Sequence, residues 1–210
     1  MHRQSLSIAL TGSGGSGVMT TGSLLLEAAA RAGWYGFMSR SSGPQIRGGE
    51  AAAVVRLANE PVESPGDSFD LVLAIDPASM SRFLAEIPLR RDSLVITDPD
   101  AGRRGGELPD VPAQVLNLPM AKLAKAIPGG RPNMIALGAI ARMIGMPEAS
   151  IYPVLEKILK SKGPDIIETS WSCVQSGFAA GTDLPVFEKP QFEKGLGERW
   201  SVTGNEAAGL

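Results

Sequence analysis

A glycine-rich segment near the start of the chain is the part best suited to hold a ligand. Residues 12–17 read GSGGSG and match the pattern G-x-G-x-x-G. Glycines permit a tight turn that a ligand can approach closely, and the N–H groups at the start of a following helix attract phosphate. A strand-to-helix turn without a ligand would have the same sequence. The pattern predicts a phosphate site whose candidate residues are Gly12, Gly14, Gly15 and Gly17, with hydroxyl groups from Thr20 and Thr21.

The segment after the second predicted strand bears on which phosphate compound would bind. A dinucleotide-binding domain has an acidic residue there that binds the ribose hydroxyls. Residues 38–42 read MSRSS and contain no carboxylate, so Arg40 and the serines could instead contact the 2′-phosphate of NADP. No lysine follows Gly17, which excludes a P-loop. An NADP-binding, Rossmann-like oxidoreductase domain is therefore one alternative.

A second polar segment, residues 40–50, reads RSSGPQIRGGE. Its Gly-Pro and Gly-Gly pairs favour tight backbone turns. Arg47 can make bidentate contacts to a phosphate or a carboxylate. The segment is open to two interpretations, a loop that faces a ligand or a solvated surface loop.

Strands and helices alternate along the chain. Strands are predicted at Ser5–Leu10, Trp34–Met38, Ala51–Leu57, Leu71–Ile75, Leu94–Thr97 and Gln114–Leu118. Helices are predicted at Val18–Ala32, Ala78–Glu86, Met120–Ala126, Met134–Ile144, Ile151–Lys160 and Ile166–Ala180. This alternation predicts a three-layer α/β/α domain with a mostly parallel central sheet. The glycine-rich turn then joins the first strand to the first helix, which is where a phosphate site of this kind lies.

Several other polar positions have a structural interpretation beside a functional one. Asp76-Pro77 follows an aliphatic strand and reads as the N-cap and first residue of a helix rather than as a catalytic carboxylate. Lys122 and Lys125 could meet phosphates, but one face of a solvated helix explains them equally well. Residues Asp98–Pro112 are rich in Gly, Pro and charge, and predict an exposed loop.

The composition limits what the chain can do by itself. Its 210 residues, 43% of them hydrophobic, suffice for one domain and a tail. A net charge of −2 argues against general nucleic-acid binding, and the absence of any run of about 18 apolar residues argues against a membrane span. Cys173 and His2 are the only residues of their types, so this chain alone forms no disulfide, zinc site or iron–sulfur site. A single cysteine suits a reducing cytoplasm.

The order of the motifs resembles that of a known family. GSGGSGVMTTGSLLLEAA is followed by SSGPQIRGGEAAAVVRL, and then by EPV, DLVLAID and NMIALG. This combination resembles the γ domain of the 2-oxoacid:ferredoxin oxidoreductases, a family that includes the pyruvate, 2-oxoglutarate and indolepyruvate enzymes. The resemblance covers residues 5–180 and implies the α/β fold of that γ domain.

The resemblance also implies a function. In that family a 2-oxoacid loses CO2 on thiamine diphosphate, electrons pass through iron–sulfur clusters to ferredoxin, and CoA takes up the acyl group. This domain would help to bind CoA through the glycine-rich turn, and 2-oxoglutarate is the expected 2-oxoacid. Partner domains or subunits would carry thiamine diphosphate, Mg²⁺ and 4Fe–4S clusters. A loop facing the reaction centre would contain Ser41, Ser42, Gly43 and, as a fixed positive charge, Arg47.

The end of the chain has a different character. Residues 183–199 are rich in Pro, Phe, Glu, Lys and Gly, and are interpreted as a linker or arm after a domain of residues 1–182. Residues 200–210 contain Gly-Asn-Glu-Ala and look like the opening of the thiamine-binding α domain in family members whose γ domain is fused in front of it. An ordinary tail is the alternative interpretation. We expect residues 200–210 to begin a second domain.

Overall fold

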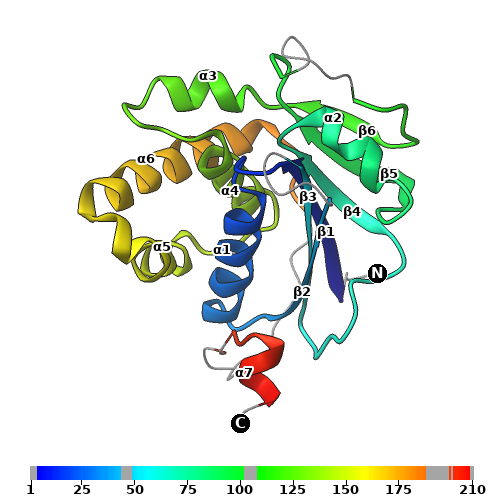
Figure 1. Ribbon diagram of the computed structural model, residues 1–210, viewed down its shortest axis with the longest axis horizontal. Coiled ribbons are helices and arrows are strands. Elements are labelled where there is room, and N and C mark those ends of the chain that lie inside the picture. Colours follow the sequence, from blue (N-terminus) through cyan, green and yellow to red (C-terminus); the bar gives the residue numbers. More distant parts are fainter. Residues whose placement is uncertain (1–3, 44–48, 102–107, 188–198, 200, 209–210) are drawn as a thin grey trace.

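Six β-strands form the centre of the computed structural model (Figure 1). The structure describes residues 4–43, 49–101, 108–187, 199 and 201–208. The strands are β1 (Ser5–Ser13), β2 (Tyr35–Ser42), β3 (Glu50–Ala58), β4 (Phe69–Ala74), β5 (Leu89–Thr97) and β6 (Gln114–Asn117). The α-helices are α1 (Val18–Arg31), α2 (Pro77–Met80), α3 (Met120–Lys125), α4 (Pro132–Met143), α5 (Tyr152–Leu159), α6 (Pro164–Ala180) and α7 (Gly204–Ala208). Short 3-10 helices are η1 (Ser81–Phe83), η3 (Glu148–Ser150), η4 (Lys160–Lys162) and η5 (Gly181–Asp183). None of the helices described here has the length and apolar character needed to cross a membrane.

The direction of the strands brings most of their carboxyl ends to one edge of the sheet. The strand order is β2-β3-β1-β4-β5-β6. β1, β4, β5 and β6 run parallel, whereas β3 is antiparallel to both of its neighbours, β1 and β2. The prediction of a mostly parallel sheet is confirmed, with β3 as the exception. Sheets of this kind bind ligands beyond the carboxyl ends of their strands.

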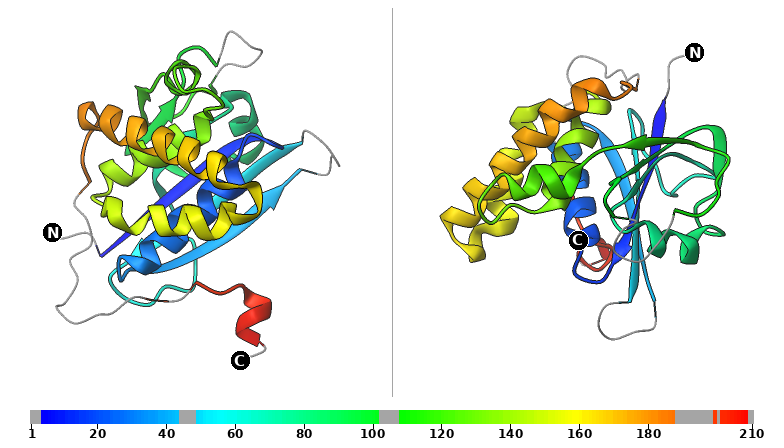
Figure 2. Two further views of the ribbon diagram at one scale, coloured as in Figure 1. Left: turned by 90° about the vertical axis from the view of Figure 1, so that its left-hand side faces the viewer. Right: turned by 90° about the horizontal axis from the view of Figure 1, so that it is seen from above.

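The two faces of the sheet are covered unequally (Figure 2). On one face α1, α4 and neighbouring helices bury a large aliphatic cluster that includes Leu10, Leu25 and Ile135. On the other face α2 and η1 contribute Met80 and Phe83 to a smaller cluster. β1 carries apolar side chains on both faces, as strands covered on both sides do. The predicted three-layer α/β/α arrangement is confirmed, and one of its outer layers is thin.

α4 is buried on all sides, as its uniformly apolar sequence predicts. Ten of its 12 residues are buried. It meets α6 at glycines on both helices, because a Cβ on Gly138 would overlap the carbonyl oxygen of Val174 and a Cβ on Gly177 would overlap that of Ile135. The two helix backbones therefore touch directly, which only residues without a side chain permit.

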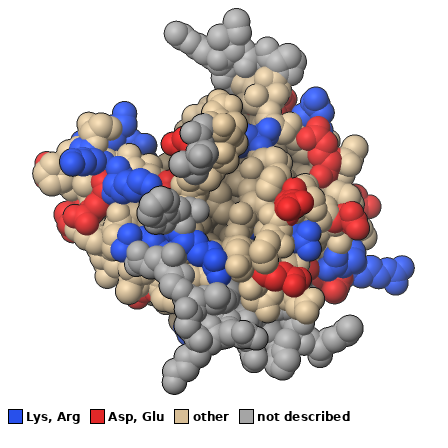
Figure 3. Space-filling model, turned by 90° about the horizontal axis from the view of Figure 1, so that it is seen from below, with Lys and Arg blue, Asp and Glu red and all other residues tan. Residues whose placement is uncertain are grey.

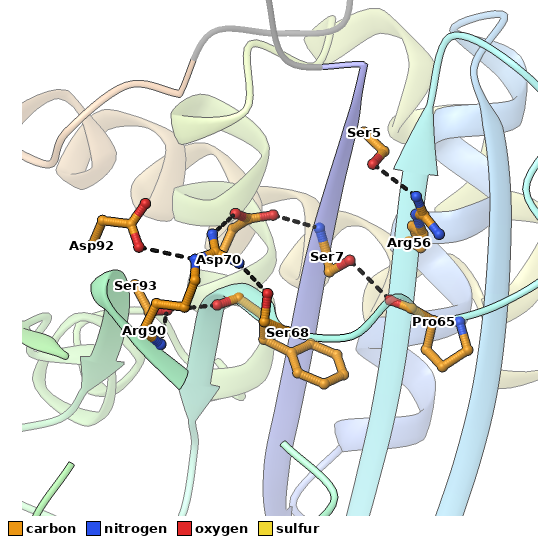
Figure 4. Close-up of polar contacts among 10 residues, drawn as sticks. Ser5, Ser7, Arg56, Pro65, Ser68, Asp70, Arg90, Asp92 and Ser93 are labelled. Carbon is orange, nitrogen blue, oxygen red and sulfur yellow. Dashed lines mark hydrogen bonds and ion pairs between the residues drawn. The ribbon is translucent and has the colours of Figure 1, made fainter. Parts of the chain in front are cut away.

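A polar network joins β1, β4 and β5 at the edge of the sheet opposite the carboxyl ends (Figure 4). Asp70 Oδ2 accepts a hydrogen bond from the Ser7 N–H at 2.9 Å, and Asp70 Oδ1 lies 2.8 Å from Arg90 Nη2. Arg90 also donates to Asp92 and to Ser68. The hydrogen bonds to Asp92 and Asp70 raise the pKa of Arg90. Because Asp70 is buried, losing these hydrogen bonds would leave desolvated polar groups without partners. The bonds therefore hold the amino ends of β1, β4 and β5 together.

Arg199 packs at the end of α1 that is far from the glycine-rich turn. The Arg199 backbone N–H donates to the carbonyl oxygen of Ala30 at 2.9 Å, and Arg199 Nε donates to that of Gly33 at 3.1 Å. The Arg199 guanidinium also lies 3.5 Å from the ring centre of Tyr35. Figure 3 shows the molecule from this side, with Lys and Arg gathered toward the helices and charges of both signs mixed toward the other side.

Two predicted elements have different bounds in the structure. β2 continues to Ser42, past its predicted end at Met38, because all of its residues pair with β3. The prediction of a helix at Ala78–Glu86 is wrong in its length. The α-helix α2 ends at Met80, and the 3-10 helix η1 continues only to Phe83.

Replacing Gly138 by alanine should destabilise the fold, because the added methyl group would force α4 and α6 apart. We expect the free energy of unfolding to fall by about 1–3 kcal/mol, as measured by urea denaturation followed by circular dichroism. Gly204→Ala is the matched control, because a Cβ at that position meets nothing within 4 Å. Equal stability of the two variants would contradict the close helix contact.

Candidate functional site

A cleft of about 1130 Å³ opens at the carboxyl edge of the sheet. The segments that follow β1, β4 and β5 line one part of it, and residues of α3, α4 and α6 line much of the rest, with Ala51 of β3, Leu159 of α5 and Lys162. These segments are distant in sequence and meet because the parallel strands all end at this edge. The glycine-rich turn, from Ser13 to Gly17, lies wholly within the lining.

Two glycines of the turn have backbone angles that other residues avoid. φ is 91° at Gly15 and 90° at Gly17, a region in which glycine carries no steric penalty. Gly15 has open space where a Cβ would lie. The Gly14 N–H donates to the carbonyl oxygen of Gly49 at 2.6 Å, which ties the turn to the start of β3. The turn therefore offers backbone surface to the cleft.

α1 begins directly after this turn. Gly17 is its N-cap residue, and no described side chain caps the helix start with a hydrogen bond. The N–H groups of the first helical turn have no acceptor within the helix, and the helix dipole favours an anion beside them. Val18, Met19 and Thr20 all line the cleft. Backbone N–H groups could thus hold a phosphate at this end of the cleft.

Gly12 and Thr21 lie beneath the turn rather than on the surface of the cleft. Gly12 is part of β1, and a Cβ there would lie 2.5 Å from Ser16 Oγ. Its missing side chain leaves the space in which the turn folds back over the strand. Thr21 is 0% exposed and its hydroxyl faces Asn133 of α4. Both residues can support the turn from inside, whereas Thr20 lines the cleft itself.

Ser41 and Ser42 are the last two residues of β2, and their prediction as loop residues is wrong. Successive strand residues point to opposite faces of a sheet. Ser42 lies in register with Ala51, which faces α1, so Ser41 lies on the other face. β2 is separated from β1 by β3, and neither serine nor Gly43 lines the cleft. Arg47 lies outside the described residues.

The cleft carries charges of opposite sign on its two sides. Asp76, Asp98 and Asp100 line it beside the ends of β4 and β5. Arg131 and Lys162 line it on the side of the helices. An anionic ligand is therefore favoured next to α4 and the glycine-rich turn, and disfavoured near the ends of β4 and β5.

Two of the acidic residues are engaged in local hydrogen bonds. Asp98 is 5% exposed, so the predicted exposed loop is wrong at its first residue. The Asp98 carboxylate accepts the N–H groups of Asp100 at 2.9 Å and Ala121 at 2.6 Å, which joins β5 to α3. Asp76 occupies the predicted N-cap position of α2, but its side chain makes no capping hydrogen bond to a helix N–H and instead accepts one from Ser79 Oγ at 3.0 Å. Both carboxylates thus have structural roles.

The remaining reactive side chains lie away from the cleft. Cys173 is buried in α6, and burial raises the pKa of its thiol. A protonated, buried thiol is a poor nucleophile. Lys122 and Lys125 are exposed on α3 and are absent from the lining among the described residues, which agrees with the solvated helix face.

Two basic lining residues, Arg131 and Lys162, were not singled out from the sequence, and Asn133 entered only as the first residue of the motif NMIALG. Pro132 and Asn133 also directly precede the helix predicted at Met134–Ile144. Lys162 lies in the 3-10 helix Lys160–Lys162 that follows α5. A lysine is common at such an exposed helix end, so its type gives no functional signal. Nothing in their local sequence points to a ligand, because they reach the cleft only through the packing of α4 and α6.

Comparison with known proteins identifies the family. A family model described as pyruvate ferredoxin/flavodoxin oxidoreductase matches residues 7–180. The chain belongs to this family. It is 24% identical over 156 residues to the 2-oxoglutarate synthase subunit KorC of Archaeoglobus fulgidus, covering 74% of this chain and 79% of the relative. The subunit KorC of Methanothermobacter thermautotrophicus is 27% identical over 178 residues, covering 81% and 92%.

Solved structures of the family share the fold. A 2-oxoglutarate:ferredoxin oxidoreductase from Magnetococcus marinus, with 2-oxoglutarate, coenzyme A and succinyl-CoA bound, matches with a TM-score of 0.75 at 23% identity. The match covers 91% of this chain and 33% of the Magnetococcus chain, so the present chain spans a third of that one. The γ subunit of a keto/oxoacid ferredoxin oxidoreductase from Geobacter sulfurreducens matches with a TM-score of 0.64 at 25% identity, covering 85% and 99%. The resemblance inferred from the motifs is confirmed.

Alanine should be tolerated less well at Gly17 than at Gly15. A positive φ destabilises an alanine by about 1–2 kcal/mol at either position, but only at Gly17 would the Cβ also overlap the Asn133 side chain. Urea unfolding should therefore show the larger loss of stability for Gly17→Ala. Equal losses of stability in the two variants would mean that the Asn133 side chain can move away from an added methyl group at almost no cost in free energy.

Proposed function

We propose that this chain is the γ-type domain of a 2-oxoacid:ferredoxin oxidoreductase and that its cleft helps to bind CoA. The observation that carries the CoA assignment is the glycine-rich turn, which presents uncapped backbone N–H groups to a cleft at the carboxyl edge. The related Magnetococcus structure, with coenzyme A bound, supports this choice. We favour 2-oxoglutarate as the 2-oxoacid, because the relatives named above are 2-oxoglutarate synthase subunits.

The phosphates of CoA would lie on the side of the cleft formed by the turn and the helices. Backbone N–H groups around Gly14, Gly15 and the start of α1 would donate to them, and the hydroxyl of Thr20 is on the same side. Arg131 and Lys162 add positive charge there. The acidic side of the cleft would repel phosphate and so define the orientation of the ligand.

This chain would contribute ligand binding, while partner domains or subunits carry out the redox chemistry. In the complete enzyme, thiamine diphosphate with Mg²⁺ would supply the decarboxylation, and iron–sulfur clusters would deliver electrons to ferredoxin. Among the described residues, no cysteine or histidine lines the cleft. Thiolate ligands for a cluster must therefore come from elsewhere in the assembly.

We also propose that residues 200–210 open the thiamine-binding α domain. α7 begins with a capping box, in which the Thr203 N–H donates to Glu206 Oε2 at 2.6 Å and the Glu206 N–H donates to Thr203 Oγ1 at 3.2 Å. The hydrogen bond from the Thr203 backbone is the main cause of the lowered pKa of Glu206. The sequence thus encodes a helix start here, and none of the α7 residues is buried against this domain.

Titration calorimetry with CoA and with NADPH separates the proposal from the NADP alternative. We expect the chain to bind CoA at least about tenfold more tightly than NADPH. Gly15→Leu should abolish CoA binding, because the side chain would fill the open space above the turn. A preference for NADPH would favour a Rossmann-like oxidoreductase domain, and full CoA affinity in the Gly15 variant would contradict a backbone cradle.

Arg47→Ala should impair the complete enzyme without unfolding this domain, because the substitution removes a positive charge proposed to face the reaction centre. We expect kcat/KM for CoA to fall about tenfold, measured by steady-state kinetics of the assembled oxidoreductase. Arg91→Ala is the matched control, since Arg91 is exposed near the amino end of β5. Unchanged kinetics of the Arg47 variant would argue against its role.

A further inference from the structure

Thr21 and Asn133 form a buried polar pair between α1 and α4, beneath the glycine-rich turn. Thr21 is 0% and Asn133 5% exposed. Asn133 Nδ2 donates to Thr21 Oγ1 at 3.2 Å, and Thr21 Oγ1 in turn lies 3.5 Å from the backbone carbonyl oxygen of Asn133, to which it donates. The pair joins residues 112 positions apart in the chain, on two helices that contribute apolar residues to one large core cluster.

Asn133 also supports the turn directly. A Cβ on Gly17 would lie 3.0 Å from the Asn133 Cβ and would overlap the side-chain amide, so the amide rests against the Gly17 backbone. The carbonyl oxygen of Gly17 accepts the hydrogen bond of the Thr21 N–H at 2.9 Å. The Asn133 side chain thus contacts both ends of the first turn of α1.

The position of this contact links the two helices at the cleft. α1 and α4 both begin there, and Gly17, Val18, Pro132 and Asn133 all line it. An aliphatic pair would fill the same space but would impose no direction on the contact. A buried hydrogen bond does impose one, because breaking it leaves two desolvated polar groups without partners. The pair therefore fixes how the start of α1 sits relative to α4.

We infer that Asn133, together with Thr21, is a positioning residue for the phosphate-binding turn. It holds Gly17 and the first turn of α1 in the arrangement that lets their N–H groups converge on one anion. The identity of that anion as a CoA phosphate rests on the proposed function. The arrangement itself is a property of the free chain and is testable without a ligand.

Amide hydrogen exchange in the full 210-residue chain, without ligand, tests the positioning. In Asn133→Ala and in Thr21→Val, we expect the amide of Thr21 to exchange at least about tenfold faster relative to amides of β1. Thr21→Ser keeps the hydroxyl and should retain most of the protection. Unchanged exchange at Thr21, or an increase that is uniform over the whole chain, would overturn the inference.

Asp70→Ala is the matched control for general loss of stability. It removes the acceptor of the Ser7 N–H at the opposite edge of the sheet. Exchange should then rise across the strands, without a selective effect on the amide of Thr21. The same selective loss at Thr21 in this variant would overturn the assignment to Asn133.

Ligand affinity gives a second readout that a purely structural role would not change. Calorimetry should show about tenfold weaker CoA binding in Asn133→Ala and Thr21→Val, while the affinity for pantetheine, which has no phosphates, stays the same. The double variant should bind no more weakly than the single ones, because the pair acts as a unit. Unchanged CoA affinity in variants that lose local protection would overturn the positioning role.

The two experiments also separate this inference from the proposed function. If the unaltered chain binds no CoA, the proposed function fails, whereas the exchange experiment still decides whether Asn133 holds the turn.

Discussion

The placement of α4 determines the shape of the cleft. Gly138 brings its backbone into contact with α6, so the helix cannot move closer to that neighbour. At its start, Asn133 rests against Gly17 and bonds to Thr21 of α1. Interiors are packed too densely for a helix held in this way to shift independently. The start of α4 thus holds the glycine-rich turn in one position. The turn itself would contact a ligand mainly through its backbone.

The two edges of the sheet differ in how their polar groups are satisfied. At the amino edge, Asp70 and Arg90 join the strands through buried and half-buried hydrogen bonds. At the carboxyl edge, the turn leaves helix N–H groups uncapped, and charged residues line a cleft. Groups left without internal partners are tolerated there because a ligand or water can satisfy them. The stabilising network and the proposed binding site therefore lie at opposite ends of the same strands.

No cysteine or histidine lies among the described residues that line the cleft. Backbone N–H groups, Arg131 and Lys162 can hold and orient an anion, but they cannot transfer electrons. Cys173, the single thiol, is buried with a raised pKa. Under the proposed function, partner domains would supply the redox chemistry, and this domain would form one wall of a site shared with them.

The sequence by itself determined the features that depend on neighbouring residues or on a short period. The glycine-rich turn, the alternation of strands and helices, the N-cap position of Asp76 and the burial of α4 were all predicted from local pattern. The order of the motifs also identified the family. Only the tertiary structure decided the features that depend on a distant partner: the extension of β2 along β3, the burial of Asp98 against α3, and the pairing of Thr21 with Asn133. Local sequence cannot encode these, because a hydroxyl or carboxylate takes its role from the group it meets, and that group is chosen by the packing of the whole chain.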